Sequence, residues 1–105
     1  MPKLIIRMKT RPRKELEFAQ IMESLIKEFR KGPGCLSNHL KREQDSEFRL
    51  ASKWETMADL EKHFRSQLFS VFLGALRTLC ESSEVKIVNG SRTLGMEAVD
   101  EARSK

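Results

Sequence analysis

The chain has few of the residues that mark disulfide-rich, disordered or fibrous proteins. Its 105 residues include only two cysteines, three prolines, five glycines and no tyrosine. Hydrophobic residues make up 39% and charged residues 33%, which excludes disorder by composition and collagen-like repeats. No apolar run approaches the roughly 20 residues that cross a bilayer, and the N-terminal apolar run is too short for a signal peptide. We therefore expect a cytoplasmic protein with one domain over residues 1–105 and no membrane partner.

The two cysteines, Cys35 and Cys80, have no partners at the spacing of metal ligands. We expect no metal site, and we expect two free thiols, because a disulfide between them is disfavoured in a reducing compartment.

Positive charge is concentrated at the N-terminus. The formal net charge is +5, and residues 1–14 carry six basic side chains and no acidic one. Such a segment could contact nucleic acid or an anionic ligand, but a solvated strand end and loop is the favoured interpretation, because nucleic-acid domains usually spread basic residues over a face with aromatics between them.

Hydrophobic periodicity predicts an alternating order of strands and helices. Residues 4–8 form an apolar, β-branched run, and residues 14–30 carry an apolar stripe at helical spacing that ends at Gly32-Pro33-Gly34. Two alternating strands follow at 35–42 and 48–55. A helix then begins after Thr56, and a second helix covers 68–80 after a break at Ser66 and Gln67. A fourth strand at 85–88 ends at Asn89-Gly90, a strong hairpin signal. Residues 91–105 are expected to form an extra strand or an arm, with a frayed tail.

This order predicts a ferredoxin-like split βαβ domain of the α+β class. The expected core covers about residues 3–88, with a four-stranded antiparallel sheet and helices on one face. The other face would carry Ile5, Ala51 and Val88 among charged residues. Because the first strand is apolar on both sides, we expect a second copy to cover that face in a homodimer.

Alternation within the hairpin predicts which residues face the helices. In the first strand these are Leu36, Asn38 and Leu40. In the second strand they are the four residues Phe48, Leu50, Ser52 and Trp54.

Three segments resemble the antibiotic biosynthesis monooxygenase family in their order and spacing. They are Pro33-Gly34-Cys35-Leu36, Lys53-Trp54-Glu55 and the helical run Asp59-Leu60-Glu61-Lys62-His63-Phe64, and the likeness extends from about Lys3 to Val88. The resemblance implies a dimeric α+β barrel with a cavity between sheet and helices. It also implies oxidation of quinol or polycyclic phenolic aromatics by molecular oxygen without a metal, flavin or haem, so no cofactor is expected.

The resemblance and the alternation pattern together suggest site residues. Trp54 would stack on an aromatic ligand or serve as a core tryptophan, and His63 would accept a phenolic proton or donate to a backbone carbonyl. Asn38 and Ser52 face the helices and would bind substrate oxygen or satisfy each other across the hairpin. Any cavity between sheet and helices would also be lined by the apolar helix residues Phe69, Phe72 and Leu76.

Departures from the family pattern keep a second function open. Some relatives relay a proton through tyrosine, which this chain lacks, and carry an amide where it has Leu50. A non-catalytic dimer that binds an apolar small molecule or has a structural role is therefore the alternative. Haem degradation is disfavoured, because the first strand has no Asn and the helix at 68–80 has no His. A nucleic-acid partner is disfavoured too, because Phe48 and Trp54 share a face with Leu50, which implies burial.

Overall fold

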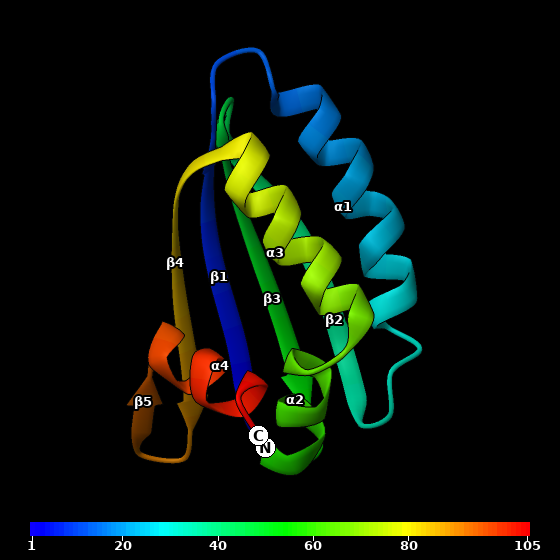
Figure 1. Ribbon diagram of the computed structural model, residues 1–105, viewed down its shortest axis with the longest axis vertical. Coiled ribbons are helices and arrows are strands. Elements are labelled where there is room, and N and C mark those ends of the chain that lie inside the picture. Colours follow the sequence, from blue (N-terminus) through cyan, green and yellow to red (C-terminus); the bar gives the residue numbers. More distant parts are fainter.

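A computed structural model describes all residues 1–105, and helices cover one side of its antiparallel sheet (Figure 1). The elements in chain order are β1 (Lys3–Thr10), α1 (Glu15–Phe29), β2 (Cys35–Gln44), β3 (Glu47–Trp54), α2 (Met57–Phe64), α3 (Gln67–Leu79), β4 (Cys80–Asn89), β5 (Arg92–Leu94) and α4 (Met96–Arg103). Up to β4 this is the order that the sequence predicts.

The sheet has the strand order β2-β3-β1-β4-β5, which confirms the ferredoxin-like α+β fold. It has the four expected strands and a fifth, β5, which is the extra strand that the sequence analysis gave as one alternative for the residues after Gly90. β5 pairs with β4 through Val88 and Thr93. Gly90 makes this hairpin feasible, since it adopts a φ of 64°, a left-handed conformation that glycine tolerates.

The core lies between the inner face of the sheet and the helices. Leu4, Ile6 and Met8 of β1 alternate with exposed or half-buried neighbours and are at most 2% exposed themselves. They pack with the buried stripe of α1, which consists of Phe18, Met22, Leu25, Ile26 and Phe29. The alternation predicted for β3 is also confirmed, since Phe48, Leu50, Ser52 and Trp54 are all buried.

The prediction for Leu36 is wrong. Its side chain is 48% exposed, while Asn38 in the same strand is 1% exposed. The register between β2 and β3 shifts between Cys35 and Ser37, so the alternation of inward and outward side chains restarts after the shift.

The C-terminal tail is a helix rather than a frayed end. Val99 and Ala102 of α4 are buried in the core, and α4 lies beside α2 (Figure 1). The Arg103 guanidinium donates to the Phe64 carbonyl at 2.6 Å and to the Ser70 hydroxyl at 2.9 Å. Sequence analysis did not find this helix because only two of its side chains are buried.

Side-chain caps determine where α2 and α3 begin. The Thr56 hydroxyl accepts from the Asp59 amide at 3.1 Å, and the Ser66 hydroxyl accepts from the Phe69 amide at 3.2 Å. This confirms the helix start expected after Thr56 and the break between the two helices. None of the helices has the length and apolarity needed to cross a membrane.

Candidate functional site

Trp54, the last residue of β3, is held in place by its own strand and by the N-terminus. It is 1% exposed, its backbone N–H donates to the Pro2 carbonyl at 3.0 Å, and its indole Nε1 donates to the Ser52 hydroxyl at 2.9 Å. Because both donors have partners, the ring has one orientation and can serve as a fixed wall.

His63 stacks on this wall from α2. The two ring centroids are 4.6 Å apart with an interplanar angle of 29°, and His63 is 8% exposed. Phe29 and Phe69 lie nearly perpendicular to the imidazole, at centroid distances of 4.7 and 5.1 Å. Four aromatic rings from β3, α1, α2 and α3 therefore meet at one point.

This aromatic environment determines the protonation state of His63. Burial lowers the pKa of the imidazole from 6.5 to about 4, because the charged form loses its hydration. The ring is therefore neutral at neutral pH. Its Nε2 is buried and has no hydrogen-bond partner in the protein, which is rare for a buried polar atom.

A cavity of about 200 Å³ opens beside the two stacked rings. Its walls come from the end of α1, the following loop, the end of β3, α2 and the start of α3. They consist of Glu28, Phe29, Gly32, Pro33, Trp54, Asp59, Lys62, His63, Ser66 and Leu68. Gly34 closes one end of the loop with a φ of 81°, and any side chain there would collide with Asp59.

Asn38 lies next to this site and not in the cavity itself. Its register partner across the hairpin is Ser52, the acceptor for Trp54. Both polar atoms of its amide are buried and form no hydrogen bond of normal geometry, and the neighbouring polar group is the Cys35 thiol, a weak partner. A second cavity of about 250 Å³ adjoins it, lined by Arg30, Cys35, Leu36, Ser37, Asn38 and His39.

The remaining predicted residues lie at increasing distance from the cavity. Phe69 packs behind His63, and Phe72 packs behind Phe29 and Phe69 at 6.2 and 5.3 Å between centroids. Leu76 is half-buried on another side of α3, where it lines a separate surface cavity with Arg77.

Sequence analysis missed Phe29, Pro33, Lys62 and Leu68 as lining residues. Phe29 was the last member of the α1 stripe, and Pro33 belongs to the predicted helix stop. Both could have been found by asking which segments meet the end of β3. The position of Lys62 at the rim depends on the angle of α2 and leaves no signal in the sequence.

Neither cysteine belongs to a cluster that could hold a metal ion, and no group of three or more His, Cys, Asp or Glu side chains is placed to do so. Burial raises the pKa of the Cys35 thiol and raises that of Cys80 to about 11. Both thiols are therefore protonated at neutral pH and are poor nucleophiles.

The fold and site together define a ferredoxin-like α+β protein with an aromatic pocket between sheet and helices. Residues 1–75 match the family model described as antibiotic biosynthesis monooxygenase. The chain belongs to this family. No curated protein matches the chain.

Solved structures show the same fold at low sequence identity. One, an antibiotic biosynthesis monooxygenase, has a TM-score of 0.78 at 19% identity, covering 88% of this chain and all of its own. A conserved protein of Methanosarcina mazei has a TM-score of 0.78 at 23% identity, with 84% and 90% covered. SnoaB, a cofactor-independent oxygenase of Streptomyces nogalater, has a TM-score of 0.73 at 20% identity, with 89% and 95% covered.

Proposed function

We propose that this protein is a cofactor-independent monooxygenase that oxidises an electron-rich phenolic aromatic of the quinol or polycyclic type with molecular oxygen. The cavity beside Trp54 and His63 would hold the substrate. The observation that carries the proposal is the buried Nε2 of His63, which has no partner in the protein and lies among aromatic rings. Membership of the family and the likeness to a cofactor-independent oxygenase support it.

The chemistry balances without an external reductant. In the hydroxyl form of an anthrone-type phenol, loss of the hydroxyl proton to His63 gives a phenolate whose negative charge is delocalised onto the para carbon. This anion transfers one electron to oxygen, the resulting radical pair combines at that carbon, and return of the proton gives a hydroperoxide. Loss of water then leaves a carbonyl, so one oxygen atom enters the product and the other leaves as water.

His63 fits the role of hydrogen-bond acceptor for the substrate hydroxyl. With a pKa of about 4 against about 10 for a phenol, full proton transfer to free imidazole would cost about 8 kcal/mol. Pairing of the new imidazolium with the phenolate offsets part of this cost, because His63 itself is 8% exposed and surrounded by aromatic rings. His63 would therefore act as a base only while the anion is beside it.

The size of the cavity limits the substrate. Pockets for drug-sized ligands usually measure about 300–1,000 Å³, and this one is about 200 Å³. A phenol of one or two rings with C–H hydrogens para to its hydroxyl, which can follow the same chemistry as an anthrone, fits better than a larger polycycle. The ring would lie against Phe29 and the Pro33 loop, with its hydroxyl toward His63.

Oxygen consumption by the purified protein with hydroquinones and anthrone-type phenols tests the proposal. Each rate is corrected for spontaneous oxidation, and His63→Phe is compared with the same substitution at the exposed His39. We expect saturable uptake that His63→Phe lowers at least tenfold and His39→Phe leaves unchanged. Equal rates in all three proteins, or no uptake above the buffer, would contradict it.

The second candidate is a non-catalytic protein that binds an apolar aromatic molecule. The absence of tyrosine and the weak basicity of His63 favour it. Trp54 is the single tryptophan, so its fluorescence reports on the cavity directly. Saturable quenching by a phenol without oxygen uptake would favour binding over catalysis. In either case we keep the homodimer as part of the proposal, formed over the uncovered sheet face.

A further inference from the structure

The uncovered face of the sheet is basic. The residues of β1 that alternate with its buried residues point to this face. Their partners in the strand register, and the partners of those residues in turn, show which residues of β2, β3 and β4 share the face. The basic ones are Lys3, Arg7, Lys9, Lys41, Arg49, Lys53 and Lys86. The acidic ones at matching positions are Glu47 and Glu84.

Like charges lie directly opposite each other across this face. Arg49 is the register partner of Arg7 on one side and of Lys41 on the other, and Lys3 is the partner of Lys53. Such like-charge pairs destabilise a sheet. Destabilising arrangements of this kind are expected at sites where a protein binds a ligand. The row of Lys41, Arg49 and Arg7 therefore needs an explanation.

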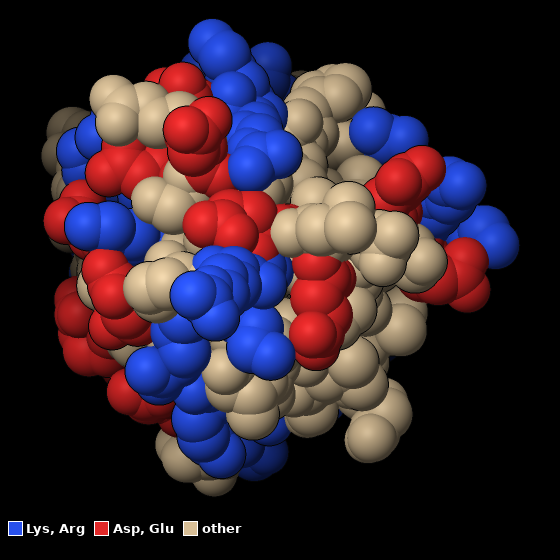
Figure 2. Space-filling view, turned by 90° about the horizontal axis from the view of Figure 1, so that it is seen from above, with Lys and Arg blue, Asp and Glu red and all other residues tan.

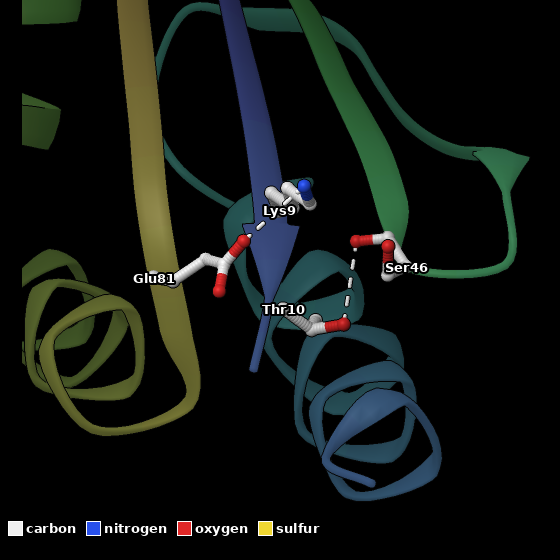
Figure 3. A network of polar contacts seen from close by, with 4 residues as sticks. All are labelled: Lys9, Thr10, Ser46 and Glu81. Carbon is white, nitrogen blue, oxygen red and sulfur yellow. Dashed lines mark hydrogen bonds and ion pairs between the residues drawn. The ribbon is translucent and has the colours of Figure 1, made fainter. Parts of the chain in front are cut away.

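Acidic side chains of the protein neutralise only one of these seven basic groups. Lys9 alone of the seven forms an ion pair, with Glu81 at 3.3 Å (Figure 3). Glu84 lies opposite Arg7 in the register, but the two side chains form no ion pair or hydrogen bond. At the end of the molecule shown in Figure 2, by contrast, basic side chains lie interspersed with acidic ones. In the first turn of α1 and just before it, for example, Glu17 pairs with Lys14 at 3.8 Å.

The basic row borders a hollow of about 280 Å³ on the sheet surface. Its lining consists of Ile5, Arg7, Arg49, Glu84 and Lys86. Three of the five side chains are cationic and one is anionic. Two guanidinium groups from adjacent strands suit a tetrahedral oxyanion, because each can donate two parallel hydrogen bonds.

We propose that this hollow binds a phosphate-class oxyanion, held by Arg7 and Arg49 with Lys86 at its side. The face carries no Phe, Trp or Tyr, so it has no platform on which nucleic-acid bases could stack. The ligand is therefore recognised through its charge. In a homodimer formed over this face, the same anion would neutralise the excess positive charge between the two sheets.

The test is the melting temperature in chloride and in inorganic phosphate at equal ionic strength and pH 7.5. Ligand that binds only the folded state raises stability by mass action. We expect a saturable rise in phosphate for the native protein, a rise reduced at least by half in Arg7→Gln and Arg49→Gln, and an unchanged rise in Lys27→Gln. Lys27 is exposed on α1, so this control matches the charge change at a position remote from the hollow.

The control separates specific binding from the general stabilisation that phosphate gives to folded proteins. Arg49→Gln should also melt higher than the native protein in chloride, because it removes two like-charge pairs. An equal phosphate effect in all four proteins would overturn the proposal. A particular sedimentation result would also overturn the proposal. In that result the protein is a dimer in chloride, Glu84→Gln dissociates the dimer, and phosphate has no effect on it. Carboxylates of a second copy would then occupy the hollow in place of phosphate.

Discussion

The two faces of the sheet hold uncompensated polar groups of opposite kinds. On the inner face the Asn38 amide and the His63 Nε2 are sealed away from water and form no hydrogen bond of normal geometry. On the outer face of the single chain Arg7 and Arg49 are register partners, and neither forms an ion pair with an acidic side chain. An unpaired buried group costs far more than an exposed like-charge pair, so the inner face gives the stronger evidence for a ligand site.

The largest expected change in the free energy of unfolding comes from truncating two adjacent isoleucines of β1 that point to opposite faces of the sheet. Ile6 is 0% exposed on the inner face, and Ile5 is half-buried on the outer face. Ile6→Ala should lower the free energy of unfolding by about 4 kcal/mol, through lost burial and the cavity left behind. Ile5→Ala should cost about 1 kcal/mol or less. Urea denaturation of both variants gives the comparison, and equal losses would contradict the assignment of the two faces.

The next effect is a pH dependence from His63. Its pKa is about 4 in the folded protein and 6.5 for an unburied imidazole, so between these pH values only the unfolded chain binds the proton. The stabilisation that comes from the neutral, buried His63 is fully present above pH 6.5. It is lost progressively as the pH falls, and the free energy of unfolding is lower by about 3 kcal/mol at pH 4.

Urea denaturation at pH 7.5 and pH 4.5 measures this change. His63→Phe should reduce the pH dependence, and His39→Phe should leave it unaltered because His39 is exposed. A native pH dependence that both variants share would show that other groups cause it.

A smaller effect is expected at the polar pair of the hairpin. Asn38→Leu removes a buried amide whose one polar neighbour is the weakly hydrogen-bonding Cys35 thiol, and should raise the free energy of unfolding by about 1–2 kcal/mol. Ser52→Ala removes the acceptor of the Trp54 N–H and should lower it by about 1–2 kcal/mol. Thermal denaturation distinguishes the two signs. A loss of stability in Asn38→Leu would mean that the amide has a stronger partner than the thiol.

The smallest effect is expected on the outer face. Lys53→Gln removes the charge opposite Lys3 and should raise the free energy of unfolding by about 0.5 kcal/mol. The gain should disappear in high salt, which screens exposed charges. A gain that persists at 1 M NaCl would point to a cause other than charge repulsion.

Periodicity predicted the inner face well because burial imposes it. The positions of Leu50, Ser52 and Trp54 followed from alternation along one strand, and α2 was placed by the Thr56 cap. The error at Leu36 arose from a register shift, which depends on how two strands pair and not on the pattern of either one.

The site could be predicted only in part. The resemblance pointed to Trp54 and His63, and the structure stacks them at 4.6 Å. Leu76 faces another cavity because α3 presents only part of its apolar surface to the site. The like-charge rows of the outer face needed the strand register, which a single sequence does not supply.

The central claim is that His63 Nε2 accepts a hydrogen bond from a phenolic ligand. The chain has two histidines, so nitrogen-15 NMR of histidine-labelled protein resolves this atom beside an internal control. Titration with a hydroquinone under nitrogen prevents oxidation. The account predicts a saturable shift of the His63 Nε2 resonance while both His39 resonances stay in place. No shift at His63, or equal shifts at both residues, would contradict it.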